Sequence, residues 1–270
     1  MQLAVSSRSF EPDLTAGRLQ LWDLPGEARL LGVTHVELYD AHLRPARPPF
    51  LGGLRRYLNP PSPAPPDRAY DFKQLNRIDK ALDHYDVKLA AWACDCGLGK
   101  PDELPRARAY VRLALDTARQ LGAQVLRITL DHDAVRRDVG PTISALEALV
   151  VDAELAGVRL AVENDRPSAS VERILGIIQG VNSAWLGACL NFAHFDPRSP
   201  AGLFERLAER TVHVHVEGGA GRGLDTLYSA YLGVLRTLRY EGVIAAEYVG
   251  EGDPRAGISR MLDEIRRVWR

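Results

Sequence analysis

Four polar residues stand at or near the ends of short apolar runs in the second half of the chain. They are Glu163, Asn191, His215 and Glu247, and typical runs read Arg-Leu-Ala-Val-Glu and Val-Ile-Ala-Ala-Glu. If the runs are parallel strands of one barrel, their carboxyl ends meet at a common mouth. Two carboxylates, an imidazole and an amide oxygen could hold one divalent cation there. An oxygen-rich set with one imidazole suits Mn²⁺, Mg²⁺, Co²⁺ or Zn²⁺.

A cation at this mouth would act as a Lewis acid on a carbonyl or a hydroxyl pair of the substrate. Glu163 and Glu247 would flank it and could move a proton on and off carbon. The implied chemistry is isomerisation or epimerisation of a small sugar through a metal-stabilised enediolate. His213 shares a strand face with His215, because side chains alternate along a strand, so it is expected one layer below.

The elements that would position these residues alternate along the chain. Helical periodicity marks runs such as 104–121 and 141–156, and Asp71–Tyr85 is a further expected helix. Gly122, Gly157 and Gly242 stand at helix-to-strand junctions, where C-terminal caps are common. Eight strands are expected between the helices, at 3–7, 35–39, 88–93, 125–129, 159–163, 185–191, 211–216 and 243–248.

Eight strands alternating with helices over this length predict an α/β fold, a single (β/α)8 TIM barrel in one domain over residues 1–270. The alternative is an open doubly wound sheet, which would usually carry a Gly-x-Gly-x-x-Gly turn after an early strand. No such turn occurs in the chain. The long connection after the second strand, residues 44–67, is rich in proline and cannot form regular helix or sheet. It could be a lid, a stiff surface loop or an oligomer contact.

Composition limits the possible partners. The formal net charge is −1, hydrophobic residues make up 46% of the chain and charged residues 26%, as in an ordinary soluble protein. The balanced charge indicates neither a nucleic-acid nor a membrane partner. Three cysteines predict no disulfide framework. With no signal peptide or membrane span expected, we predict a cytoplasmic protein that could form homo-oligomers.

These motifs give the chain a resemblance to the xylose isomerase-like TIM-barrel superfamily, the sugar phosphate isomerase/epimerase group. The resemblance runs from Leu-Ala-Val-Ser-Ser near the start to Ala-Glu-Tyr at 246–248. It implies that Glu163 and Glu247 are the paired metal-binding catalytic glutamates and that His215 is the histidine ligand. It also implies substrate contacts from His194 and, less directly, from Arg222, which is displaced by one position.

The chain departs from this family at two places. The family usually has Asp where this chain has Asn191, which lowers the formal ligand charge from −3 to −2 and implies weaker metal binding. The frequent His-x-Lys-Asp stretch reads His215-Val-Glu217-Gly218 here. The loss of Lys and Asp makes a standard sugar-epimerase pocket less secure, and Glu217 is expected to offer an acidic group near the substrate instead.

Other strand-end residues are candidates for the pocket wall. Trp92 could stack on a sugar face or simply be core, and His132 lies in the polar stretch Asp131-His-Asp, which could instead be a solvated loop capping a helix. Further polar residues follow the second and third strands, namely Glu37, Asp40, His42, Asp95 and Cys96.

Three functions remain open. The first is the metal-dependent isomerase or epimerase of a small carbohydrate. The second is a lyase or dehydratase acting on a cyclitol, a sugar acid or a glycoside through the same groups. The third is a barrel that binds a ligand without turning it over. This hypothesis rests on Asn191, which stands where the family usually has Asp. Nucleic-acid cleavage fits poorly, because the chain has only seven histidines and no basic stripe.

Overall fold

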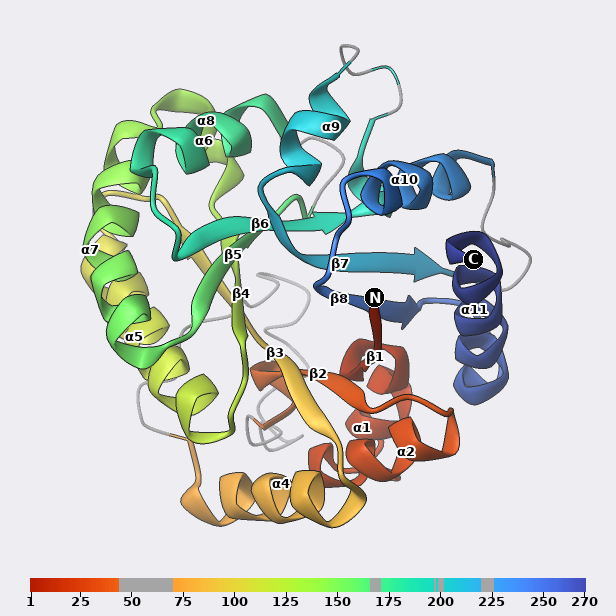
Figure 1. The fold of residues 1–270 in the computed structure, drawn as a ribbon. Helices are drawn as coiled ribbons and strands as arrows, with labels where there is room; N and C mark the ends of the chain where they lie inside the picture. Colours follow the sequence, from red (N-terminus) through yellow and green to blue (C-terminus); the bar gives the residue numbers. More distant parts are fainter. Residues whose placement is uncertain (44–69, 166–170, 197, 199–201, 220–225) are drawn as a thin grey trace, which may run out of the picture.

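Eight parallel strands close into a barrel in the computed structural model, which describes residues 1–43, 70–165, 171–196, 198, 202–219 and 226–270. Each strand pairs with the next along the chain, and β8 pairs with β1 to complete the ring. Figure 1 shows the strands at the centre and the helices around them. The predicted (β/α)8 barrel is therefore confirmed, and the open sheet is not formed.

The strands are β1 (Gln2–Ser6), β2 (His35–Tyr39), β3 (Lys88–Leu98), β4 (Val125–Leu130), β5 (Arg159–Glu163), β6 (Leu186–Asn191), β7 (Thr211–Gly218) and β8 (Val243–Tyr248). The α-helices are α1 (Glu11–Thr15), α2 (Leu24–Leu30), α4 (Phe72–Tyr85), α5 (Leu104–Gln120), α6 (His132–Arg137), α7 (Gly140–Ala156), α8 (Val171–Val181), α9 (Leu203–Ala208), α10 (Thr226–Thr237) and α11 (Pro254–Trp269). Short 3-10 turns are η1 (Ser7–Phe10), η2 (Leu21–Asp23), η3 (Asp40–Leu43) and η4 (Phe192–His194).

Two of the three predicted glycine caps are confirmed. Gly122 and Gly157 have φ values of 70° and 68°, the left-handed conformation that glycine adopts without strain. The prediction of a helix cap at Gly242 was wrong, because α10 ends earlier and the residue with positive φ there is Arg239, at 55°. Gly242 instead leaves room for Tyr240, since an added Cβ would lie 2.3 Å from that hydroxyl.

The barrel interior is filled differently at different depths. Small side chains lie two residues before three of the polar ones on the same strand face, and they belong to compact clusters. Examples are Ala161 below Glu163, Cys189 below Asn191 and Ala245 below Glu247. The main apolar core lies between the strands and the surrounding helices. This layering leaves the space above the small residues for a polar cluster at the carboxyl ends of the strands.

The proline-rich connection at 44–67 lies outside the described residues. Within the described part of the chain, no helix is long and apolar enough to cross a membrane.

Candidate active site

Three of the four predicted ligands lie in direct contact. Glu163 at the end of β5 accepts hydrogen bonds through Oε1 from Asn191 Nδ2 at 3.0 Å and from His215 Nδ1 at 2.9 Å. All three side chains are buried. Strand pairing explains the contact, since Asn191 is the register partner of His215 across β6 and β7. The parallel barrel therefore brings these strand ends together as expected.

A second carboxylate, Glu37 of β2, lies on the other side of His215. Its Oε2 is 2.7 Å from Nε2 of His215 and 2.6 Å from Nε2 of His213. Ser6 of β1 donates to Oε1 of the same carboxylate at 3.2 Å. His215 is therefore held between two carboxylates, one at each ring nitrogen, which favours its charged form.

Arg127 is the unexpected member of the cluster. It projects from β4, is 1% exposed, and its Nε lies 2.9 Å from Glu163 Oε2, an ion pair without good hydrogen-bond alignment. Its Nη1 pairs with Asp95, and its guanidinium lies over the Tyr39 ring with Cζ 4.4 Å from the ring centre. A buried guanidinium costs desolvation energy unless it is paired, and this one is paired twice.

Asn191 is oriented by its surroundings. Its side-chain Oδ1 accepts the backbone N–H of Ala193 at 3.0 Å and so caps the turn η4. Its Nδ2 therefore faces Glu163 as a donor. Asn164 fixes the backbone of Asn191 by donating to its carbonyl at 2.9 Å and accepting its N–H at 2.7 Å. The amide consequently presents NH2, which cannot bind a cation, toward the cluster.

Glu247 of β8 is separate from this hydrogen-bonded group. Its Oε1 lies 3.4 Å from Nε of Arg8, whose side chain is 43% exposed. Its Oε2 is buried and has no hydrogen-bond partner among the described residues. Burial raises the pKa of Glu247 to about 7, although Arg8 and His215 act in the opposite direction. A carboxyl group with a pKa near neutrality can both accept and return a proton.

The other carboxylates remain charged. Burial alone would raise the pKa of Glu163, but Arg127 and His215 outweigh it and hold the pKa well below its ordinary value. The pKa of Glu37 is also lowered, because His215 and His213 outweigh burial. Burial likewise opposes charge on His215, yet the carboxylates of Glu37 and Glu163, one at each ring nitrogen, raise its pKa well above 6.5. The cluster is therefore a set of fixed charges around Glu163.

Two groups of side chains bring three candidate metal-ligand atoms within 4.8 Å of one another: Glu37, His213 and His215, and Glu163, Cys189 and His215. Ligand atoms around a cation at about 2.1 Å are spaced by about 3 Å or more. The contacts of Glu37 with its two histidines are shorter, at 2.6 and 2.7 Å, and are those of hydrogen bonds. Burial raises the pKa of Cys189 to about 12, which keeps this thiol protonated.

The predicted quartet of Glu163, Asn191, His215 and Glu247 does not fit a divalent cation either. Asn191 turns a donor toward Glu163, and the second oxygen of Glu163 is taken by Arg127. Each carboxylate of the quartet thus has an arginine beside it, Arg127 for Glu163 and Arg8 for Glu247.

The predicted substrate-binding residues are spread over several places. His194 and Glu217 lie together at the rim, with Nε2 3.8 Å from Oε2, and both are partly exposed. His132, at the start of α6, is paired with Asp165. Trp92 is fully buried in the core outside the barrel, where its ring meets Tyr70 edge-on at 5.7 Å. Arg222 lies outside the described residues.

Sequence reasoning passed over Arg127, Arg8 and Tyr39. Glu37 was expected only as one of several groups at the pocket wall. The available signal was a charge inside an apolar run: Arg127 stands within Val-Leu-Arg-Ile-Thr and Glu37 within His-Val-Glu-Leu-Tyr. A charged residue in a buried strand is rare unless it is paired.

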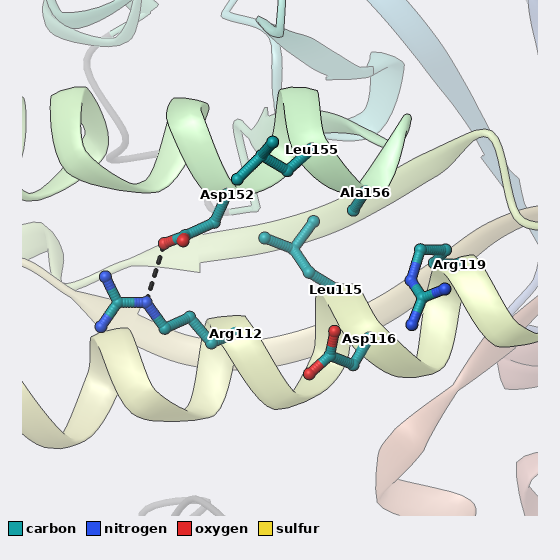
Figure 2. A pocket seen from close by; sticks show the side chains of 7 residues that line it. All are labelled: Arg112, Leu115, Asp116, Arg119, Asp152, Leu155 and Ala156. Carbon is teal, nitrogen blue, oxygen red and sulfur yellow. Dashed lines mark hydrogen bonds and ion pairs between the residues drawn. The ribbon is translucent and has the colours of Figure 1, made fainter.

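A groove between α5 and α7 lies on the outside of the barrel (Figure 2). It is lined by Arg112, Leu115, Asp116, Arg119, Asp152, Leu155 and Ala156. Its main polar feature is an ion pair of 2.7 Å between Arg112 and Asp152. Neither group of candidate metal-ligand atoms found in the described part of the chain includes a residue of this groove, so the site is placed at the strand ends.

The family follows from the sequence match. The chain belongs to the xylose isomerase-like TIM barrel family, whose model matches residues 26–268. No curated protein matches the chain. Solved structures share its fold over nearly its whole length.

One similar structure is D-allulose 3-epimerase from Methylomonas sp., with 14% identity and a TM-score of 0.73, covering 99% of this chain and 98% of that one. Another is 3-keto-D-glucoside 4-epimerase YcjR from E. coli, with 12% identity and a TM-score of 0.72, covering 99% of each chain. A third is an IolI protein with a bound zinc atom, with 16% identity and a TM-score of 0.71, covering 100% of this chain and 98% of that one. At these identities the likeness describes the fold.

Proposed function

We propose that this barrel is an isomerase or epimerase of a small sugar or sugar derivative. It would transfer a proton to and from a carbon next to a carbonyl group. The observation that carries the proposal is Glu247, a buried carboxyl with an unpartnered oxygen in the described residues and a pKa raised to about 7. The family membership and the fold shared with sugar epimerases support the class of substrate.

Removal of the proton places negative charge on the substrate's oxygens, and that charge needs cationic neighbours. Arg8 lies 3.4 Å from Glu247, and the imidazolium of His215 and the guanidinium of Arg127 lie deeper in the barrel. His194 and Glu217 are at the rim, where sugar hydroxyls would be bound. The proposal assigns no step to the divalent cation that the sequence predicted, since the quartet does not fit it.

A lyase or dehydratase is the second candidate. It would begin with the same proton abstraction by Glu247 and would then need an acid to protonate the departing hydroxyl. The pair of His194 and Glu217 at the rim, 3.8 Å apart, is the feature that favours it. The mass of the product separates the two reactions, since isomerisation leaves it unchanged and dehydration lowers it by one water.

The proposal is tested by incubating the protein in D2O with a panel of ketoses, keto-glycosides and cyclitols. Proton NMR should show exchange at the carbon next to the carbonyl, and mass spectrometry should show one deuterium per turnover. Glu247→Gln should slow exchange by about 10²–10⁴-fold, the usual contribution of a positioned base. The matched control is Glu251→Gln, an exposed residue nearby, which should leave the rate unchanged. Exchange that survives Glu247→Gln, or no exchange with any member of the panel, contradicts the proposal.

A further inference from the structure

The centre of the barrel contains a balanced set of charges. Its buried carboxylates are Glu37, Glu163 and Glu247. Facing them are the guanidinium groups of Arg127 and Arg8 and the imidazole of His215, which lies between two of the carboxylates. Three buried acidic groups thus meet three basic ones, and the partly exposed Asp95 adds a further carboxylate beside Arg127. A divalent cation would add two positive charges to a site that already has its counterions.

We infer that Arg127 supplies the positive charge that a divalent cation would otherwise supply, so that this barrel works without a metal. The inference rests on the site of the proposed function and deepens it. It names the cationic group next to the central glutamate, and it predicts how the site responds to added metal.

Position supports this role for Arg127. Its Nε lies 2.9 Å from Glu163 Oε2, so the oxygen that would face a cation faces a guanidinium. The group cannot swing away freely, because its Nη1 is paired with Asp95 and its plane lies over Tyr39. Burial opposes its charge, but Glu163 outweighs burial and raises the pKa of Arg127 well above its ordinary value, so its charge is permanent.

The side-chain amide of Asn191 also supports this inference. Asn191 donates through Nδ2 to Glu163 Oε1 at 3.0 Å, while its Oδ1 is held by the N–H of Ala193. An aspartate here would place a carboxylate oxygen against Glu163, and the two like charges would repel unless a cation lay between them. Asparagine replaces that repulsion with a hydrogen bond. The residue type therefore suits a site without a metal.

The wild-type protein provides the first test. After treatment with EDTA, it is titrated with Co²⁺ or Mn²⁺ by calorimetry, and its urea midpoint is measured with and without millimolar metal. We expect no saturable binding, no visible Co²⁺ absorption band and no shift of the midpoint, because a ligand that binds only the folded state would raise it. One equivalent of Co²⁺ or Mn²⁺ bound with micromolar affinity, and lost in Glu163→Gln, overturns the inference.

A gain of function provides the second test. The double variant Arg127→Met, Asn191→Asp removes the guanidinium and supplies a carboxylate. It should bind Co²⁺ saturably, at least about tenfold more tightly than the weakest affinity the titration detects, the scale on which neighbouring groups tune metal sites. Asn191→Asp alone should not bind Co²⁺ more tightly, since the guanidinium of Arg127 is still paired with Glu163. The matched control pairs Asn191→Asp with Arg112→Met, an exposed arginine of α5 that pairs with Asp152. It should also gain nothing.

A folded double variant, judged by circular dichroism and gel filtration, that gains no affinity contradicts the inference, as does equal gain in the Arg112 control. If the double variant does not fold, the wild-type titration still decides. Both tests measure metal binding without substrate. Their failure is therefore distinct from failure of the exchange assay, which tests the proposed reaction.

Discussion

Glu37 is the residue on which the buried charges depend most. Its carboxylate accepts from His213 and His215 through one oxygen and from Ser6 through the other. Removing its charge would leave the imidazolium of His215 with Glu163 as its remaining carboxylate contact. Removing one partner of a buried ion pair lowers stability strongly, because the other charge stays buried without a counterion.

We therefore expect Glu37→Gln to lower the free energy of unfolding at neutral pH by about 3 kcal/mol, as for other broken buried pairs. The effect should depend on pH. The folded-state pKa of Glu37 lies well below its ordinary 4.5, so the folded protein binds fewer protons than the unfolded chain. Its contribution is complete above about pH 4.5 and is lost as the pH falls toward the folded-state pKa. Urea unfolding between neutral and acidic pH measures this.

The difference between wild type and Glu37→Gln should accordingly shrink in acid. The control is Glu147→Gln on the exposed face of α7, which should change the free energy of unfolding by less than about 0.5 kcal/mol, as surface substitutions do. A difference at Glu37 that stays constant down to acidic pH would show that packing, and not charge, is responsible.

The polar residues at the strand ends could be identified from the sequence, but their hydrogen-bond and ion-pair partners could not be predicted. Their positions at the ends of apolar strands placed Glu163, Asn191 and His215 at a common mouth, and the structure brings them into contact. Whether an amide turns its oxygen or its nitrogen inward depends on a backbone N–H two residues away, that of Ala193. Likewise, Arg127 reaches Glu163 across neighbouring strands, a contact fixed by barrel register.

At the scale of elements, β6 and β7 set the contact between Asn191 and His215. The pairing of these strands shifts between Ala188 and Cys189, in the middle of β6. Gly187 lies beside this shift, where an added Cβ would be 2.6 Å from Val212 Cγ1 and 2.7 Å from the carbonyl oxygen of Arg210. The strands approach closely because this position has no side chain.

Gly187→Ala should therefore destabilise the protein by about 2 kcal/mol, the usual effect of overpacking a core. The carbonyl oxygen belongs to the backbone, so β6 or β7 must shift to relieve the contact. The matched control is Gly176→Ala in α8, where an added Cβ meets nothing within 4 Å. That change should stabilise the helix by up to about 1 kcal/mol. Urea unfolding of the two variants gives both values, and equal effects would contradict the steric argument.

Strand positions were predictable because buried strands read as short apolar runs between helical patterns. β2, β5 and β8 match the predicted bounds. β3 runs on to Leu98, five residues past the predicted end, through an irregular stretch between Cys94 and Leu98 where its pairing with β4 shifts. This extension is polar at Asp95 and breaks the apolar pattern, so composition alone could not assign it to a strand.

At the scale of the whole molecule, the first and last parts of the barrel must join. β1 and β8 pair in parallel, with Leu3 opposite Ile244. On the outside of the barrel, the guanidinium of Arg255 in α11 donates two hydrogen bonds of 2.7 Å to the carboxylate of Glu27 in α2. Glu27 is mostly buried, whereas the arginine side chain is 43% exposed. The pair thus connects helices separated by most of the chain, while solvent screens part of its energy.

A double-mutant cycle with Glu27→Ala and Arg255→Ala should give a coupling energy of about 1 kcal/mol, the upper end for a partly exposed pair with two aligned hydrogen bonds. The comparison pair, Asp263 and Arg266 within α11, has one contact of 3.0 Å, and Asp263 is exposed. Its cycle should give about 0.3 kcal/mol, as for local helix pairs. Unfolding should remain one transition by both fluorescence and circular dichroism, because the closed ring leaves no strand edge from which to unfold separately. A second transition in Arg255→Ala would show that strand pairing alone does not keep the ring closed, whereas equal coupling in the two pairs would show that the long-range ion pair adds nothing beyond a local one.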